Sequence, residues 1–301
     1  MDEKDWVILQ TIFQERNISK AAEKLYISQP ALTYRLQQLE REFGTMIVAR
    51  GKRGVEFTAQ GEYIAQYARN MILQLRNTKE FVQNMDKEIR GVLRIGVSGI
   101  FARYELPAIL KEFINHYPNV EVNVKTGWSA EINHLLHKEE VHVGIVRGNY
   151  IWQEEKYLFR EEPMLIVSQK QIKNIKELPN LPRVNYETDQ TQKTLIDNWW
   201  QETFDQPPTV TMEVDRIDTC KEMVLMGLGY AILPSICLKK EDDVHKIILT
   251  KKNREPLKRN TWLLYRERSL SLSAVQAFVD FLKEYDNIKI DDKDLIPQKF
   301  E

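Results

Sequence analysis

Cysteine is nearly absent from this chain of 301 residues. Its two cysteines, Cys220 and Cys237, cannot build a disulfide framework, so we expect a reduced, cytosolic protein. The chain also lacks an apolar run of about 20 residues, the length that a membrane-spanning helix needs. The N-terminus, MDEKDW, is acidic and does not resemble a secretory signal peptide. We therefore expect no membrane partner.

Nucleotide-binding signatures are missing as well. The sequence has no phosphate-binding P-loop and no dinucleotide fingerprint. The one Gly-rich stretch, GLGYA at 227–231, follows a predicted helix and leads into a predicted strand, which reverses the nucleotide-binding order. The formal net charge of −1 also argues against a surface built for non-specific cationic binding. We expect neither an enzyme nor a cofactor.

Residues 19–43, SKAAEKLYISQPALTYRLQQLEREF, are typical of two helices joined by a tight turn. Ser19 is predicted to cap a short helix at 20–25, and Ser28 to cap a second helix that ends at Gly44. The apolar positions of the second helix are three or four residues apart and predict one buried stripe: Ala31, Leu32, Leu36, Leu39 and Phe43. The opposite face carries polar side chains that can reach base edges or phosphates: Gln29, Thr33, Tyr34, Arg35 and Gln37.

A basic loop follows this helix. Residues 46–49 and 55–57 are predicted to form two short strands, and Arg50, Lys52 and Arg53 lie between them, where three cations suit a phosphate backbone or a minor groove. Residues 1–62 hold nine Lys/Arg and nine Asp/Glu, so the positive charge is local. An ordinary helical hairpin with a charged face is the alternative, and the basic loop argues against it. The candidate DNA-binding residues are Ser28, Gln29, Pro30, Ala31, Thr33, Tyr34, Arg35, Arg50, Lys52 and Arg53.

Residues 59–87 contain no proline and one glycine, which favours a long helix. Apolar or small residues recur every three or four positions, as in a heptad seam: Ile64, Ala68, Met71, Leu75, Thr78, Val82 and Met85. One alternative is an amphipathic helix that lies on its own domain. A helix that connects two domains is more often a dimerisation helix, and this is the interpretation that we prefer.

Strands and helices alternate from residue 92 onward, which implies open α/β sheets covered by helices. We predict strands at 92–98, 120–126, 141–146, 164–168, 183–186, 210–214 and 260–265, and a short one after Gly229. We predict helices at 105–116, 129–138, 191–204, 218–226 and 271–285. The predicted domains are a DNA-binding domain at 1–58, a linker helix at 59–90 and an effector domain at 91–301. The last has two lobes, at about 91–165 with 266–301, and at about 166–265.

In such lobes a ligand binds at the carboxyl ends of strands, near helix N-termini. Arg147 and Arg259 could clamp a carboxylate there through paired hydrogen bonds, although an isolated arginine more often forms an inter-lobe salt bridge. The residues alone indicate a small anionic ligand. The candidate effector-binding residues are Ser98, Trp128, Ser129, Arg147, Thr188, Thr191, Thr219 and Arg259.

Residues 5–61 resemble the winged helix-turn-helix of LysR-type transcriptional regulators. The matching residues are Ser19, Ala21, Ala22, Leu25, Ser28, Gln29, Pro30, Ala31, Leu39, Glu40, Gly44, Arg50, Thr58 and Gly61. The resemblance implies a two-lobed effector domain like that of periplasmic solute-binding proteins. It also implies a linker helix that pairs two subunits, a dimer of dimers, and operator DNA as partner. RNA polymerase is a further candidate partner.

The second half resembles, more narrowly, the catabolite control protein C/E branch of that family. The segments that carry this resemblance are GWSAE (127–131), VHVGIVRGN (141–149), DTCKEM (218–223), GLGYAILPS (227–235) and RNTWLL (259–264). It implies citrate as effector and citric-acid-cycle genes as targets. Three carboxylates need about three cations or helix ends, which Arg147, Arg259 and the helix starts at Ser98 and Ser129 could supply. Many family members carry Asp where this chain has His142.

Two other classes of protein compete with a regulator. His134 and His137, with acidic neighbours, hint at a metal enzyme, but no Cys or Asp cluster completes the set. A solute-binding protein is the second rival, and the acidic N-terminus and the helix-turn-helix both argue against it. Whether such a regulator represses or activates is not encoded in its sequence.

Overall fold

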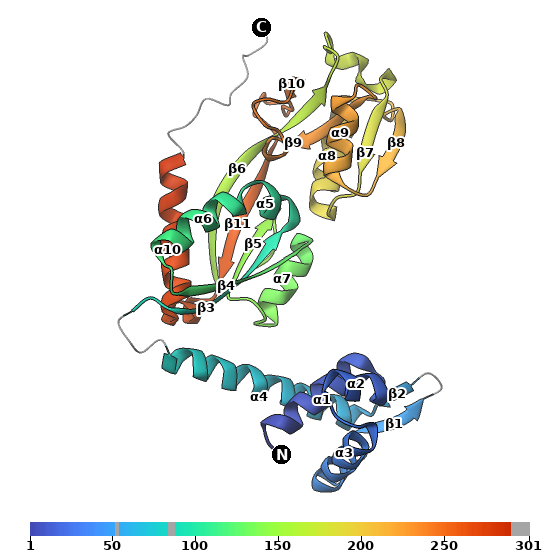
Figure 1. Ribbon diagram of the computed structural model, residues 1–301. Helices are drawn as coiled ribbons and strands as arrows, with labels where there is room; N and C mark the ends of the chain where they lie inside the picture. The colour runs from blue at the N-terminus through green and yellow to red at the C-terminus, as the bar shows by residue number, and fades with distance from the viewer. Residues whose placement is uncertain (52–53, 84–87, 290–301) are drawn as a thin grey trace. The chain divides into compact units, whose positions relative to one another are not determined.

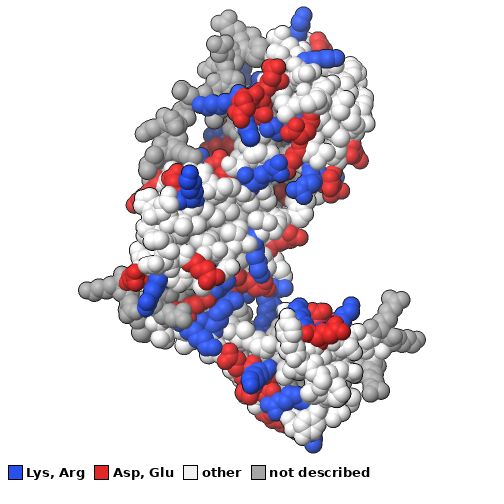
Figure 2. All heavy atoms as spheres, in the orientation of Figure 1, with Lys and Arg blue, Asp and Glu red and all other residues white. Residues whose placement is uncertain are grey.

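The computed structural model describes residues 1–51, 54–83 and 88–289 (Figure 1). The chain divides into two compact units, at residues 1–85 and 86–301. No helix in the described ranges is long and apolar enough to cross a membrane. On the face shown in Figure 2, basic and acidic side chains are interspersed, in keeping with the net charge of −1.

The first unit packs helices against a small β-hairpin. Its elements are α1 (Glu3–Glu15), α2 (Ile18–Lys24), α3 (Gln29–Phe43), β1 (Val48–Gly51), β2 (Gly54–Phe57) and α4 (Ala59–Gln83). The two strands are antiparallel, with Val48 opposite Phe57. The buried core is made of Leu9, Ile12, Ala21, Ala22, Leu32, Leu36, Leu39, Ile47, Ile64 and Ala68.

The predicted second helix of the helix-turn-helix is confirmed at both ends. Ser28 is its N-cap, and Gly44 ends it in the left-handed conformation at φ 64°. The prediction that Ser19 caps the preceding helix was wrong: Asn17 is the N-cap, because its side chain accepts from the Lys20 amide at 3.0 Å. The buried stripe is also narrower than predicted, since only its three leucines face the core. The outer stripe residues, Ala31 and Phe43, are exposed.

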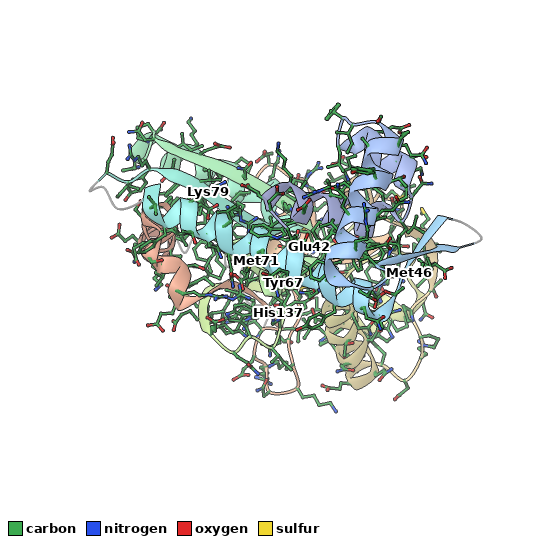
Figure 3. All side chains as sticks on the ribbon, turned by 90° about the horizontal axis from the view of Figure 1, so that it is seen from below. Glu42, Met46, Tyr67, Met71, Lys79 and His137 are labelled. Atoms are coloured by element: carbon green, nitrogen blue, oxygen red, sulfur yellow. The ribbon has the colours of Figure 1, made fainter. Side chains whose placement is uncertain are left out.

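The first part of α4 belongs to the core of its own unit. Ile64 and Ala68 are buried there, and Gln10 Nε2 donates to the Ala65 carbonyl at 2.5 Å. The first two positions of the predicted heptad seam therefore pack inside the unit. Tyr67, Met71 and Lys79 follow one another along the helix (Figure 3), while Met85, the last seam position, lies outside the described residues.

The second unit is built on one continuous mixed sheet. Its strands are β3 (Gly91–Ser98), β4 (Val120–Gly127), β5 (Val143–Arg147), β6 (Glu155–Ser168), β7 (Arg183–Tyr186), β8 (Val210–Val214), β9 (Tyr230–Pro234), β10 (His245–Ile248) and β11 (Lys258–Tyr265). Their order is β4-β3-β5-β11-β6-β9-β7-β8, and β10 pairs with β6. The helices are α5 (Gly99–Tyr104), α6 (Leu106–His116), α7 (Ser129–His137), α8 (Gln190–Thr203), α9 (Ile217–Leu225) and α10 (Ser273–Lys289). Three 3-10 turns complete the unit: Ile175–Asn180, Ser235–Cys237 and Glu267–Ser271.

The long strand β6 joins two lobes. Residues 155–163 pair with β11, whereas residues 164–168 pair with β9 and β10. Lobe I therefore holds β3, β4, β5, β11 and the first part of β6, and lobe II holds the remaining strands (Figure 1). Because β11 pairs along its length with the first part of β6, which belongs to lobe I, the return crossing lies before residue 258 and not near 266.

Several predicted elements of this unit change in extent. The strand predicted at 164–168 begins at Glu155, the helix predicted at 105–116 is confirmed as α6, and α5 and β10 were not predicted. The first part of β6 reads EKYLFREEP, which alternates weakly and contains Pro163, so its pattern does not stand out as a strand. The amphipathic final helix is confirmed, with Val275, Phe278, Val279 and Leu282 fully buried.

Candidate functional site

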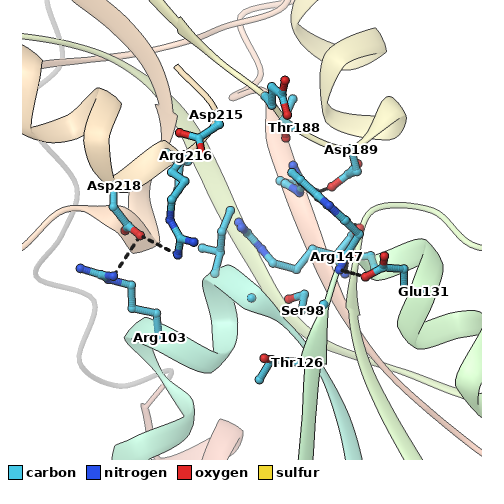
Figure 4. Close-up of a pocket in the computed structure, with 18 residues that line it drawn as sticks. Ser98, Arg103, Thr126, Glu131, Arg147, Thr188, Asp189, Asp215, Arg216 and Asp218 are labelled. Carbon is cyan, nitrogen blue, oxygen red and sulfur yellow. Dashed lines mark hydrogen bonds and ion pairs between the residues drawn. The ribbon is translucent and has the colours of Figure 1, made fainter. Parts of the chain in front are cut away.

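A cleft of about 560 Å³ lies between the two lobes of the second unit (Figure 4). It opens at the carboxyl ends of β3, β4 and β5 and at the start of α7, where ligands of open α/β sheets bind. Six of the predicted effector-binding residues line it: Ser98, Trp128, Ser129, Arg147, Thr188 and Arg259.

Two buried arginines form the inner end of the cleft. Arg147 is the last residue of β5 and is 1% exposed, and Arg259 in the neighbouring strand β11 is 3% exposed. Each has one carboxylate partner: Arg147 Nη2 pairs with Glu162, and Arg259 Nη2 pairs with Asp189. In the described part of the chain, the Nε and Nη1 atoms of both arginines are buried without a hydrogen-bond partner. Four N–H-bearing nitrogens at this end thus have no acceptor.

Two serines complete the inner end in different ways. Ser98 ends β3, and its buried hydroxyl has no hydrogen-bond partner among the described residues. Ser129 was predicted to cap the helix that follows it, but Trp128 occupies the N-cap position of α7. The Ser129 hydroxyl instead accepts from the Arg147 amide at 3.0 Å. It therefore holds the end of β5 in place, whereas Ser98 offers a free hydroxyl.

Two predicted residues lie away from the cleft lining. The Thr191 hydroxyl donates to Asp189, and a Cβ at Gly148 would clash with it. Gly148 has φ 100°, so both space and backbone favour glycine there. Thr219 lines a neighbouring cavity together with Lys221. Thr191 thus holds the Asp189 carboxylate without lining the main cleft, and Thr219 lies outside this cleft.

The sequence did not point to the residues that bridge the lobes at the opposite wall. Asp218 in α9 accepts from the Tyr104 hydroxyl at 2.7 Å and pairs with Arg103 at 3.0 Å. Arg216 approaches the same carboxylate at 3.8 Å (Figure 4). Arg103 and Tyr104 lie in α5, the helix that directly follows the strand ending at Ser98. Their position just after a cleft-lining strand is the signal that could have indicated them.

Burial and charge shift the pKa values of the inner groups. Burial, and next the Arg259 guanidinium, lowers the pKa of Arg147. Burial alone would raise the pKa of Asp189, but Arg259 and the hydrogen bonds from Thr191 and Gln192 bring it below its ordinary value. Because two guanidinium groups share a desolvated space, a bound anion would stabilise the charged form of both.

The N-terminal end of α3 in the first unit presents the polar face predicted for DNA. Gln29, Pro30, Ala31 and Tyr34 are exposed, and Thr33 is half-buried. The Ser28 hydroxyl accepts from the Ala31 amide at 3.4 Å, which holds this first turn. An exposed, capped helix end of this kind can enter a major groove.

Arg35 has a structural partner that the sequence did not reveal. Its guanidinium donates to both carboxylate oxygens of Asp5, at 2.6 and 2.7 Å, and to Gln38 at 2.7 Å. Asp5 is fully buried, so the pair ties α1 to α3. A contact of Arg35 with DNA would compete with this pair, and that contact stays a prediction.

The basic loop between β1 and β2 is described in part. Arg50 pairs with Val55 in the hairpin, but its side chain, Lys52 and Arg53 lie outside the described residues. The hairpin is anchored where the Val55 amide donates to the Arg16 carbonyl at 2.9 Å. The DNA contacts predicted for the three cations stay predictions.

Residues 4–62 match the bacterial regulatory helix-turn-helix protein family, lysR type, and residues 86–287 match the LysR substrate binding domain. The two matches cover most of the chain. It is a LysR-type transcriptional regulator.

This regulator is similar to proteins of the same kind over nearly its whole length. It is 45% identical to the uncharacterised HTH-type transcriptional regulator YraN of Bacillus subtilis, over 94% of this chain and 98% of that protein. It is 39% identical to YkuM, another uncharacterised regulator of that organism, over 92% and 95% of the two chains.

Solved LysR-type structures share its fold. A full-length OxyR variant from Pseudomonas aeruginosa matches 94% of this chain and 95% of its own, with a TM-score of 0.65 and 20% identity. Full-length CbnR in complex with its target DNA matches 94% and 99%, with a TM-score of 0.64 and 15% identity. At these identities the likeness shows the two-part fold alone.

In this LysR-type regulator, His137 packs against another side chain and the two cysteines are buried. In the described ranges, no group of three or more His, Cys, Asp or Glu side chains could hold a metal ion. His137 packs against Trp152 with ring centroids 4.9 Å apart. Cys220 and Cys237 are buried, and burial raises the pKa of each thiol to about 12. Thiolate, the reactive form, is therefore scarce at neutral pH.

Proposed function

We propose that operator binding by this LysR-type regulator is modulated by a small carboxylate bound in the cleft between the lobes. The observation that carries the proposal is the set of buried polar atoms without partners on Ser98, Arg147 and Arg259. A buried donor without an acceptor costs about 1–3 kcal/mol. These groups converge on one cavity, so an acceptor-rich ligand would satisfy them together.

Citrate is the first candidate effector, and citric-acid-cycle genes are the candidate targets. Both come from the resemblance of five segments in the second half to the catabolite control protein C/E branch. A different small carboxylate, acting on a different pathway, is the second candidate. The acidic outer wall of the cleft, with Glu187 and Asp215, favours this second candidate.

The proposed mechanism uses the two units for two tasks. The exposed end of α3 reads a major-groove half-site, and paired α4 helices of two subunits set the half-site spacing. A dimer of dimers then holds two sites and bends the DNA between them. The effector acts by binding one arrangement of the lobes more tightly than the other, which shifts subunit packing and the bend.

Replacement of Arg147 by alanine tests the role of the cleft. We expect Arg147→Ala to abolish the response of operator binding to citrate and other small carboxylates, while binding without effector persists. The measurement is a mobility-shift titration of the full chain, with Lys170→Ala, an exposed lobe II substitution, as control.

A second variant separates a lost contact from a lost fold. Arg147→Ala leaves Glu162 buried without its partner, whereas Arg147→Lys keeps a cation beside it. We expect Arg147→Lys to respond only at higher carboxylate concentration. An unchanged titration in both variants would refute the assignment of the cleft.

A further inference from the structure

The inner end of the cleft has unpaired hydrogen-bond donors for one carboxylate. Arg147 and Arg259 are each already paired with a carboxylate, Glu162 and Asp189 respectively, so their charges are neutralised before a ligand arrives. What remains unpaired is hydrogen-bond donors: Nε and Nη1 of each arginine and the Ser98 hydroxyl. A single carboxylate offers two oxygens with about four acceptor positions, which matches the four arginine nitrogens.

The outer wall of the cleft, formed by lobe II, is acidic. Glu187 follows β7 and Asp215 follows β8, and both line the cleft as exposed side chains. Among the described residues, no hydrogen bond or ion pair engages either carboxylate. The two arginines on this side, Arg103 and Arg216, lie within ion-pair distance of Asp218, at 3.0 and 3.8 Å.

The lining of the cleft therefore carries a net negative formal charge. Its lining holds four arginines (Arg103, Arg147, Arg216 and Arg259) and five carboxylates (Glu131, Glu187, Asp189, Asp215 and Asp218). Glu162 adds a further negative charge behind Arg147. The unpaired donors belong to lobe I residues and the unpaired carboxylates belong to lobe II residues, so the two sides of the cleft are chemically opposite. Figure 4 labels Ser98 and Arg147 of the first set and Asp215 of the second.

A ligand with several carboxylates would bring like charges against Glu187 and Asp215, which is unfavourable at short range. An ammonium group at that place would instead complete two ion pairs. We propose that the effector carries an ammonium group in addition to the carboxylate held by Arg147 and Arg259, so that it is a small amino acid or a close analogue. This inference rests on the proposed small-carboxylate function, and it favours the second candidate over citrate.

Calorimetry of the full chain tests the ligand class directly. The titrants are the protein amino acids, citrate, and, for each amino acid that binds, its analogue without the amino group, such as succinate for aspartate. We expect at least one amino acid to bind, and about tenfold more tightly than its deaminated analogue, since a charge-assisted contact is lost. Citrate or another carboxylate without an amine that binds more tightly than every amino acid overturns the inference but leaves the proposed function. Failure of every carboxylate overturns both.

Variants of the outer wall test the location of the ammonium group. We expect Glu187→Gln with Asp215→Asn to weaken amino-acid binding about tenfold and to leave the deaminated analogue unchanged or tighter. Glu202→Gln, at an exposed position of α8 outside the cleft, is the matched control. An equal loss for both members of the ligand pair would mean that the two carboxylates act structurally, which contradicts the inference.

Discussion

Arg147 and Arg259 show how a single residue can indicate a ligand. Each is more than nine-tenths buried, each has one carboxylate partner, and each keeps two buried nitrogens without an acceptor. Native proteins pair nearly all of their buried polar groups, so such atoms point to an acceptor outside the chain, either a ligand or an ordered water. The sequence could place each arginine beside a predicted strand, but not the two strands side by side. It could not reveal Glu162, because the part of β6 that carries this residue has too weak an alternation to be recognised as a strand.

At the same scale, Gln29 is the residue of α3 best suited to read a base. It is exposed in the first turn, and a glutamine can bond adenine through two atoms. We expect Gln29→Ala to reduce discrimination at one base pair by about 1–3 kcal/mol while binding to other positions is retained. Competition binding with single-base operator variants measures this effect. Gln201→Ala, exposed in α8, is the control, and a uniform loss across all operators would mean that Gln29 contacts the backbone.

Among the elements, α1 and α3 are joined by the pair between Asp5 and Arg35. Asp5 is fully buried, and it also completes a capping box with Asp2 at the start of α1. Replacement by asparagine removes the negative charge and one of the two oxygens that accept from the Arg35 guanidinium. Because Arg35 is 38% exposed in its side chain, solvent screening reduces the value of the pair. We expect Asp5→Asn to destabilise the first unit by about 1 kcal/mol at pH 7.

The pH dependence of this effect has a definite sign. Burial alone would raise the pKa of Asp5, but Arg35 and the Asp2 amide bring it below its ordinary value of 3.8. The carboxylate therefore stabilises the fold above the unfolded pKa, and this contribution is lost as the pH falls through the folded pKa. Hydrogen exchange of α1 and α3 amides at pH 7 and below pH 4 should show the wild-type advantage shrink. Glu15→Gln, which removes an exposed pair with Lys24, is the control, and a difference that persists in acid would contradict the assignment.

The helix α4 carries a second test at the scale of elements. Ile64 and Ala68 of α4 are buried in the core of its own unit, so pairing of α4 with another subunit requires a different set of helix positions. Tyr63, Tyr67 and Phe81 are exposed and are spaced by 4 and 14 residues, which puts them on one helix face. We expect Tyr67→Glu to shift the protein to smaller species in sedimentation velocity, because a charge would enter the paired face. Gln66→Glu is the control, and an unchanged distribution for Tyr67→Glu would locate the pairing elsewhere.

The elements also show where sequence patterns suffice. The α3 helix has a serine cap, an N-terminal proline and a left-handed glycine at its end, so its bounds could be predicted. The buried stripe on α10 could be predicted for a different reason, because its apolar residues recur with strong helical periodicity. The short helix α5, the short strand β10 and the place of β11 in lobe I depend on tertiary contacts, which leave little trace in local periodicity.

At the scale of the whole molecule, the chain combines a helix-turn-helix unit with a unit that matches the LysR substrate binding domain, each with its own core. Family membership was predictable from the helix-turn-helix and from the alternation of strands and helices. The effector class proposed above was not predictable, because the side chains on which the proposal rests come from both lobes and meet only in the folded cleft. A functional coupling between the units requires that ligand and operator change each other's affinity by the same factor.

The proposal that a ligand in the cleft controls operator binding is tested most directly by the operator affinity of the full chain with and without that ligand. The operator would be selected from random DNA, and the ligand would be the tightest binder among the amino acids and citrate. We expect saturating ligand to change the operator Kd by at least about fivefold, the lower range of allosteric coupling, and Arg147→Ala to remove this change. An operator Kd that is the same with and without saturating ligand would contradict it.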